Sequence, residues 1–384
     1  MKITRVETIV VDLPNRYAYG YNGLQVPIGN YVILRIETDS GLVGIGEAPT
    51  LPDWGGEFSR YYGEDPTTAV HMIEKYLAPV LIGEDPTNIS ALLQKLDVPV
   101  LGHNSAKSAI DLALHDLAGK AMNVPVYKLL GGKFRDWIDI CYSVGIAEPE
   151  VHAEEARLAA EDGIRSMQIK VGLSPELDIQ SIAAIREAVG PDVEIYPDAN
   201  QAYKTPKLAI RTINAMKEYG ITAVEQPVEG RRAMAQVTRE LDITVWTDEG
   251  VWTPQDALEV IQQGCADAIS LYYSKSGGLQ RTMQVGLIAA AAGFPTNLNG
   301  ALETGVGNAA NLHIAAALHG EVRPSVIPVT TLEGREVCKV GGVFYKDDII
   351  TEPFAYENGS LRVPEGPGLG VELDMDKIER YRVA

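Results

Sequence analysis

A chain of 384 residues exceeds the usual size of one compact core, so it predicts either a large barrel with an accessory domain or two domains. The 33 basic and 52 acidic residues give a formal charge of −19, which argues against nucleic acid and anionic membranes as partners because both would be repelled. No apolar run reaches the ~20 residues of a membrane helix, and the first residues lack a signal-peptide pattern. We therefore expect a cytoplasmic protein.

The first part of the chain, residues 1–130, predicts an α+β capping domain. β-branched segments come first, and Thr38-Asp39-Ser40-Gly41 has the composition of a hairpin turn between two of them. Segments with apolar residues three and four positions apart follow, which is the spacing of amphipathic helices. The expected strands are 3–11, 31–38 and 41–47, and the expected helices are 67–77, 89–96 and 105–120.

The middle of the chain, residues 131–352, repeats a unit of short apolar strand, turn and helix. Ser174, Thr205 and Thr253 each precede a proline, an arrangement typical of helix starts, and glycines stand where the helices should end. Eight such units predict a parallel (β/α) barrel of the TIM type. The expected strands are 138–144, 166–171, 194–198, 223–225, 244–248, 268–272, 295–297 and 325–329. We expect the turn-rich tail, 353–384, to return to the capping domain.

Polar residues occupy the ends of successive predicted strands, where the active site of such a barrel lies. These residues are Lys170, Asp198, Glu225, Asp248 and Tyr272. Three carboxylates that converge would repel each other unless a cation lies between them, and oxygen ligands without Cys or His favour Mg²⁺, with Mn²⁺ possible. The alternative is that each acid caps a helix or pairs with an arginine.

Several motifs in fixed order resemble the enolase superfamily, within it the muconate lactonizing enzyme subgroup of the mandelate racemase/muconate lactonizing enzyme family. The resemblance spans nearly the whole chain. It rests on Gln168-Ile169-Lys170, Pro197-Asp198-Ala199-Asn200-Gln201-Ala202-Tyr203, Val224-Glu225-Gln226-Pro227, Thr247-Asp248-Glu249, Ser276-Gly277-Gly278 and Leu302-Glu303-Thr304-Gly305-Val306-Gly307.

This resemblance implies a modified (β/α)7β-type barrel and a Mg²⁺ ion held by Asp198, Glu225 and Asp248, with a small-molecule carboxylate substrate bound to it. Lys170 matches the second lysine of the family's Lys-x-Lys pair and would remove the proton beside that carboxylate. A homo-oligomer is also implied.

Two departures from the family pattern bear on the reaction. Gln168 replaces the first lysine of the pair, and Tyr272 stands where the sixth strand usually ends in an opposing lysine. Lys275 is close by, but its position in the repeat places it in the following loop. A tyrosine is a poor second base because its pKa is ordinarily near ~10. The pattern therefore favours one-base chemistry, either cycloisomerisation or syn-dehydration, with Tyr272 assisting the leaving group, bracing the enolate or only packing.

Two other functions stay open. One is a racemase or epimerase of an amino acid or hydroxy acid derivative, with Tyr272 or Lys275 as the opposite base. The other is a barrel without catalytic activity that serves as a binding or structural protein. Loss of chirality at the α-carbon in D₂O would indicate the first, and failure to bind a divalent cation would indicate the second.

Further residues are expected to contact the substrate or support the site. Asn200 and Glu249 adjoin the expected metal ligands, and Asn297 and Glu303 belong to the seventh unit. Two capping-domain loops, 15–23 and 51–56, are expected to cover the barrel mouth with Tyr17, Tyr19 and Trp54, and Arg16 could add an anionic contact. The stretch after the eighth strand departs from the family pattern, so no residue is assigned there.

Overall fold

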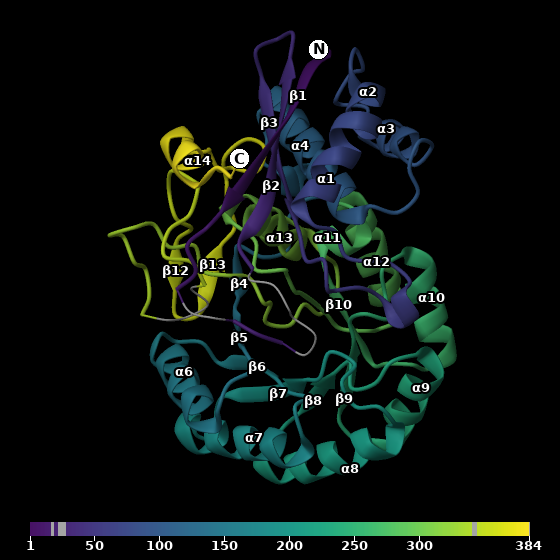
Figure 1. Cartoon of the computed structure of the whole chain (residues 1–384), viewed down its shortest axis with the longest axis vertical. Coiled ribbons are helices and arrows are strands. Elements are labelled where there is room, and N and C mark those ends of the chain that lie inside the picture. Colours follow the sequence, from purple (N-terminus) through teal and green to yellow (C-terminus); the bar gives the residue numbers. More distant parts are fainter. Residues whose placement is uncertain (17–18, 22–27, 340–343, 384) are drawn as a thin grey trace.

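The computed structural model describes residues 1–16, 19–21, 28–339 and 344–383. Figure 1 shows a strand-and-helix domain, formed by the beginning of the chain, standing on a curved sheet that is surrounded by helices. Within the described ranges, no helix is both long and apolar enough to cross a membrane.

The capping domain begins with a three-stranded antiparallel sheet in the order β1-β2-β3. The expected hairpin turn is present, with the Gly41 amide donating to the Thr38 carbonyl and Gly41 at a φ of 82°. Helix α4 packs closely on β3, and Gly46 permits this because it has no side chain. A Cβ at Gly46 would lie 1.9 Å from the Ala109 carbonyl oxygen. The bounds are β1 Ile3–Asp12, β2 Asn30–Thr38, β3 Val43–Pro49, α1 Pro66–Met72, α2 Ala78–Leu81, α3 Ile89–Leu96, α4 Asn104–Met122 and α5 Val126–Leu129. A π-helical turn, Ile73–Leu77, joins α1 to α2.

The barrel is a seven-stranded parallel sheet in the order β11-β10-β9-β8-β7-β6-β5. Its strands are β5 Cys141–Val144, β6 Ser166–Lys170, β7 Glu194–Asp198, β8 Ala223–Glu225, β9 Thr244–Thr247, β10 Ala268–Leu271 and β11 Thr296–Leu298. The prediction of an eighth strand at 325–329 is wrong. Isolated bridges from Thr296 to Val322 and from Ile140 to Ser325 join the two edges instead. Pro324 precedes this segment and Pro328 lies within it, and proline has no amide hydrogen to donate to a sheet.

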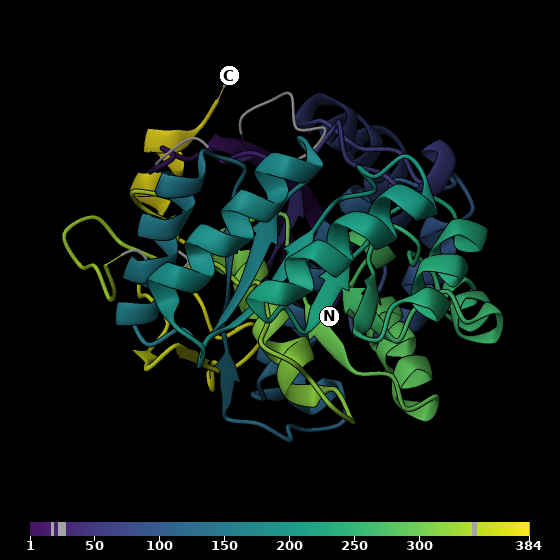
Figure 2. The ribbon, with the colours of Figure 1, turned by 90° about the horizontal axis from the view of Figure 1, so that it is seen from below.

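Helices form the outer layer of the barrel, as the view from below in Figure 2 shows. Ser174, Thr205 and Thr253 accept hydrogen bonds from the first turns of α7, α8 and α10, which confirms the predicted caps. The barrel helices are α6 Pro149–Glu161, α7 Pro175–Val189, α8 Pro206–Met216, α9 Arg231–Glu240, α10 Pro254–Gln263, α11 Tyr273–Ser276, α12 Leu279–Ala291 and α13 Gly305–Ala317.

The tail connects the barrel to the capping domain. β12 Tyr356–Glu357 and β13 Ser360–Arg362 form a small antiparallel sheet with β4 Trp137–Asp139. After α14 Met375–Tyr381, the Val383 amide donates to the Val10 carbonyl of β1 at 2.9 Å. The expected strand 138–144 is therefore divided, with β4 in this small sheet and β5 in the barrel.

A buried carboxylate of the capping domain caps a helix of the barrel. Glu47 of β3 is fully buried and accepts hydrogen bonds from the Thr304 amide at 3.0 Å and the Gly307 amide at 2.9 Å. These amides belong to the start of α13, where Asp348 also accepts from the Gly305 amide at 3.0 Å. Two acids thus satisfy backbone donors that a helix leaves open at its N-terminus.

Candidate active site

The expected base and the expected metal ligands end neighbouring barrel strands. Lys170 of β6 is the register partner of Asp198 of β7, and Asp198 is the partner of Glu225 of β8. Asp248 follows β9 directly. The three acids are fully buried, and Lys170 is 8% exposed. The parallel sheet therefore brings the four side chains to one end of the barrel, which is where the sequence places them.

Lys170 forms an ion pair with the first acid. Its Nζ lies 2.5 Å from Asp198 Oδ2, and the face of the Tyr21 ring lies 5.8 Å from the ammonium. Burial disfavours the charged amine, but attraction to Asp198, Tyr19 and Glu225 outweighs it and raises the pKa of Lys170. In this arrangement the amine is an ammonium ion.

Glu225 is surrounded by hydrogen-bond donors and by the other two acids. Gln168 Nε2 donates to its Oε2 at 2.7 Å, while Ser270 Oγ at 2.7 Å and Asn299 Nδ2 at 2.9 Å both donate to its Oε1. Burial and then repulsion from Asp198 and Asp248 raise its pKa to about 8. The raised pKa indicates that positive charge near these acids would stabilise their ionised forms.

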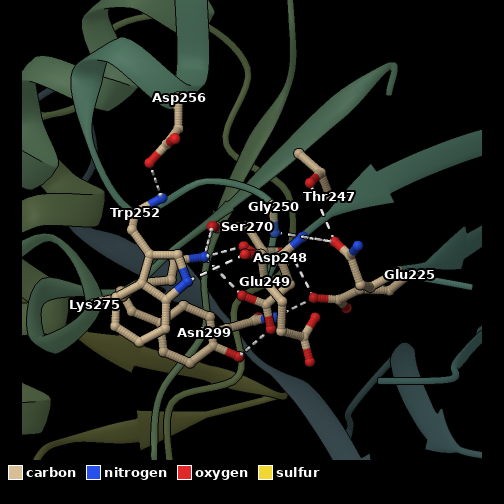
Figure 3. A network of polar contacts seen from close by, with 12 residues as sticks. Glu225, Thr247, Asp248, Glu249, Gly250, Trp252, Asp256, Ser270, Lys275 and Asn299 are labelled. Carbon is tan, nitrogen blue, oxygen red and sulfur yellow. Dashed lines mark hydrogen bonds and ion pairs between the residues drawn. The ribbon is translucent and has the colours of Figure 1, made fainter. Parts of the chain in front are cut away.

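Asp248 is held by two side chains of the sixth unit, and Figure 3 shows it with the first of them, Lys275. Lys275 Nζ donates to Asp248 Oδ1 at 2.6 Å, to the Asp248 carbonyl at 2.8 Å and to the Ser270 carbonyl at 2.9 Å. Tyr272 donates from its hydroxyl to Asp248 Oδ2 at 3.0 Å. The expectation that Lys275 lies in a loop is wrong, because it belongs to the short helix α11 and is 1% exposed.

The acids fit a hard divalent cation by their chemistry. Asp198, Glu225 and Asp248 offer only oxygen donors, which Mg²⁺ and Mn²⁺ prefer. Burial and repulsion from neighbouring acids raise the pKa of both Asp198 and Glu225. As they stand, no three acidic, histidine or cysteine side chains among the described residues form a group ready to hold a metal. Asp198 and Asp248 instead bind lysine ammonium groups, which a cation would have to displace.

Gln168 belongs to a chain of polar contacts that crosses the barrel mouth. Its Oε1 accepts from Ser143 Oγ at 2.7 Å, and the Tyr19 hydroxyl lies 2.7 Å from the same Ser143 oxygen. The other end of the Gln168 amide donates to Glu225. Gln168 therefore links the capping loop to an expected metal ligand, and it does so without bringing a charge.

Asn200 and Glu249 lie beside the expected ligands. The Asn200 amide donates to Asp198 Oδ1 at 3.0 Å, and its side chain donates to Glu249 Oε1 at 3.1 Å. Burial, and then repulsion from Asp248 and Asp198, raise the pKa of Glu249 well above its ordinary value. Asn200 has a φ of 41°, a left-handed conformation that asparagine tolerates better than most residues and that turns the chain back toward the site.

A cavity opens at this end of the barrel. Lys170, Gln168, Asn200, Tyr272, Tyr19 and Trp54 line it, and Lys275 does not. The other lining residues are Tyr21, Ile28, Leu51, Ser143, Asn299, Gly300, Ala301, Leu302 and Val326. Lys170 is the single charged residue of the described lining, and all the other lining residues are neutral.

The capping loops reach the mouth through aromatic side chains. The Trp54 ring lies 5.1 Å from the Tyr272 ring and 5.0 Å from the Trp252 ring. Tyr17 lies outside the described residues. Arg16 does not line the cavity and donates to the Lys339 carbonyl.

Two residues of the seventh unit are placed away from the cavity. Asn297 of β11 lines a separate depression that also contains Glu194 and Arg323, at the other end of the barrel. Glu303 accepts from the Ala301 amide at 3.0 Å, and burial raises its pKa to about 7. Glu303 therefore supports a lining loop, while no contact joins it to either lysine of the site.

Four polar residues of the site were not assigned a role from the sequence, although Tyr21 belongs to the expected capping loop 15–23. Ser143, Tyr21, Asn299 and Ser270 line the cavity or bond to Glu225. Ser270 lies two positions before Tyr272, so strand alternation gives both the same face of β10 and could have identified it. Asn299 follows the end of β11, a position that the strand-end argument covers.

Two family models match the chain. The model described as "Mandelate racemase / muconate lactonizing enzyme, N-terminal domain" matches residues 6–131. The model described as "Enolase C-terminal domain-like" matches residues 151–377. Together they cover the capping domain and most of the barrel.

Known proteins match over nearly their entire lengths. Muconate cycloisomerase 1 of Rhodococcus opacus is 32% identical, over 99% of this chain and 98% of the relative. N-succinyl-L-Arg/Lys racemase of Bacillus cereus is 30% identical, over 100% of this chain and 98% of the relative. The structure of muconate lactonizing enzyme from Pseudomonas putida superposes with a TM-score of 0.88, at 28% identity and with both chains fully covered.

Proposed function

Since the chain belongs to the mandelate racemase/muconate lactonizing enzyme family of the enolase superfamily, we propose that it removes the proton beside the carboxylate of a small molecule. Lys170 is the base. The reaction is a cycloisomerisation or a syn-dehydration, which need one base.

Asp198, Glu225 and Asp248 would hold the metal ion, with Mg²⁺ as the first choice and Mn²⁺ as the second. Their burial, their oxygen donors and the raised pKa of Glu225 support this assignment. A divalent cation bound there supplies positive charge beside the substrate carboxylate, where negative charge develops as the proton leaves.

The residues around the cavity would have different roles in the proton transfer. Lys170 lies at the cavity wall, and once its amine is released from Asp198 and deprotonated it can take the α-proton. Gln168 and Asn200 orient Glu225 and Asp198, while Trp54 and Tyr19 shield the reacting carbon from water. Tyr272 offers a neutral hydroxyl on the side of Asp248.

The observation that carries the one-base proposal is the difference between the two lysines. Lys170 faces the cavity, whereas Lys275 is buried outside the described lining and gives each of its three protons to an oxygen atom. An amine that donates every proton has no free lone pair for a substrate. Lys275 therefore acts as a fixed counter-charge for Asp248.

A racemase or epimerase is the second candidate. It is favoured by the 30% identity to N-succinyl-L-Arg/Lys racemase over the whole chain. This reaction would require Tyr272 to act as a base on the face opposite Lys170, or Lys275 to leave all three of its acceptors.

The decisive experiment has two parts. Calorimetric titration with Mg²⁺ and Mn²⁺ tests the metal site, and Glu225→Gln should lose binding while the exposed control Glu187→Gln keeps it. NMR then follows α-proton exchange on chiral carboxylates in D₂O. Exchange with retained configuration supports the one-base reaction, racemisation supports the second candidate, and failure to bind either metal overturns both.

Two further expectations stay predictions. We infer a homo-oligomer in the cytoplasm, and size measurement in solution tests the first. The net charge of −19 supports the expectation that neither nucleic acid nor an anionic membrane is a partner.

A further inference from the structure

We propose that the substrate carries only one negative charge, the reacting carboxylate, and that the rest of the molecule is a neutral, flat apolar group. This inference rests on the proposed function, because it places the reacting carboxylate beside Lys170. It narrows the substrate class to monocarboxylates with an unsaturated or aromatic body.

The first argument is the shortage of positive charge. Lys170 provides the single cationic side chain in the described lining, and it is committed to the reacting carbon. Lys275 is fully bonded to Asp248 and Ser270. A second carboxylate entering the cavity would lose its water and find no cation, which is strongly unfavourable.

The second argument comes from the charged residues in the sequence of the two expected capping loops. From position 17 to position 30 the chain reads Tyr-Ala-Tyr-Gly-Tyr-Asn-Gly-Leu-Gln-Val-Pro-Ile-Gly-Asn, with no charged residue. In the other loop, 51–56, the charged residue is the acid Asp53. Its Oδ1 accepts a hydrogen bond from the Tyr21 hydroxyl at 3.5 Å. The cation of the 15–23 stretch, Arg16, donates to the Lys339 carbonyl and does not line the cavity, so the described part of the capping loops brings no positive charge to the lining.

The third argument is the shape of the walls. Tyr19, Tyr21, Trp54 and Tyr272 present aromatic rings to the cavity, and Ile28 and Leu51 add apolar side chains. The Trp54 and Tyr272 rings are tilted by 36° at 5.1 Å, so they form an extended aromatic wall. Such walls bind flat, apolar groups by stacking and burial.

The proposal separates this chain from its named relatives. Muconate has a carboxylate at each end, and an N-succinyl amino acid carries a carboxylate on its acyl group. A relative with about one third identity need not share its substrate, because pocket residues decide specificity. Gln168 and Tyr272, which stand where the family pattern has lysines, remove two cations from this part of the site.

The test compares matched acids on the Mg²⁺-loaded full-length enzyme. One pair is 3-phenylpropanoate and 3-(4-carboxyphenyl)propanoate, and the other is monomethyl muconate and muconate. Calorimetry should show that the monoanion of at least one pair binds about tenfold or more tighter than its dianion. Equal or tighter binding of the dianions, or no binding of either monoanion, would overturn the proposal.

A gain of charge in the wall provides an independent check. Leu51 lines the cavity and has no role in proton transfer. Leu51→Lys should bind the dianions about tenfold more tightly than the matched neutral variant Leu51→Gln. If the two variants bind the dianions equally while both unfold like the wild type, the missing cation is not what sets the preference.

The readouts separate this inference from the proposed function. Selective binding of the monoanion without α-proton exchange in D₂O would leave the specificity intact and refute the role of Lys170. Equal rates of α-proton exchange on 3-phenylpropanoate and 3-(4-carboxyphenyl)propanoate would leave Lys170 as the base and refute the preference for monoanions.

Discussion

Lys170 and Asp198 are register partners on β6 and β7, and their side chains meet at 2.5 Å between Nζ and Oδ2. The distance between the proposed base and a proposed metal ligand is therefore set by the hydrogen-bonded sheet rather than by a loop. Backbone pairing of this kind places functional groups reproducibly.

Lys170→Gln should abolish proton transfer. The variant keeps a hydrogen-bond donor near Asp198 but has no basic nitrogen, so α-proton exchange measured by NMR should fall by at least about 100-fold. Lys204→Gln, at an exposed position beyond β7, should exchange at the wild-type rate. Undiminished exchange in Lys170→Gln would show that another group is the base.

Tyr272→Phe should have a small effect on exchange. The ring stays beside Trp54, and only the hydrogen bond to Asp248 Oδ2 is lost. Turnover should fall by no more than about tenfold, the effect of losing one neutral hydrogen bond. A loss as large as that of Lys170→Gln would instead make Tyr272 a second base and favour the racemase.

Lys275→Met should destabilise the fold. The substitution leaves Asp248 buried without its ammonium partner, so the unfolding free energy measured in urea should fall by about 3 kcal/mol. Saturating Mg²⁺ should reduce this loss because a cation at Asp248 replaces the missing charge. Equal stability of variant and wild type without metal would contradict the counter-charge role.

His313 should make stability depend on pH in a defined window. Burial lowers its pKa to about 4, and Nε2 donates to the Leu369 carbonyl at 3.1 Å. The unfolded chain takes up a proton as pH falls below about 6.5, whereas the folded protein does so only near pH 4. Stability is therefore fully present above pH 6.5 and is lost as pH falls through this window.

The measurement compares urea unfolding of the wild type and His313→Gln between pH 7 and pH 4. The wild type should lose about 3 kcal/mol more than the variant over that range. His319→Gln, which changes an exposed histidine, is the matched control. Parallel pH profiles for the wild type and His313→Gln would contradict the prediction.

Most of the fold could be predicted because its signals are local. A serine or threonine followed by proline marks the start of each of α7, α8 and α10, and apolar runs mark the seven strands of the barrel sheet. The eighth strand was predicted wrongly because a short apolar run does not reveal whether its amides can pair. Pro324 and Pro328 were the signal against it.

The site was predictable where a residue ends a strand, and less so elsewhere. Lys170, Asp198 and Glu225 come together because parallel strands share an end. Lys275 contacts Asp248 only because α11 turns the chain back after β10, and strand phase carries no information on such a turn. Asn297 was expected at the end of its strand, but β11 continues to Leu298. Asn297 therefore lines the depression at the other end of the barrel.

Glu47 makes the two parts of the molecule structurally interdependent. Its carboxylate belongs to β3, yet the amides it satisfies belong to Thr304 and Gly307 of the barrel. A chimera that exchanged the first 130 residues for those of another protein would need an acid at the same place. Without that acid, the buried amides at the start of α13 would lose their acceptor. Replacing a single substrate-recognition loop should therefore disturb the protein less than replacing the whole capping domain.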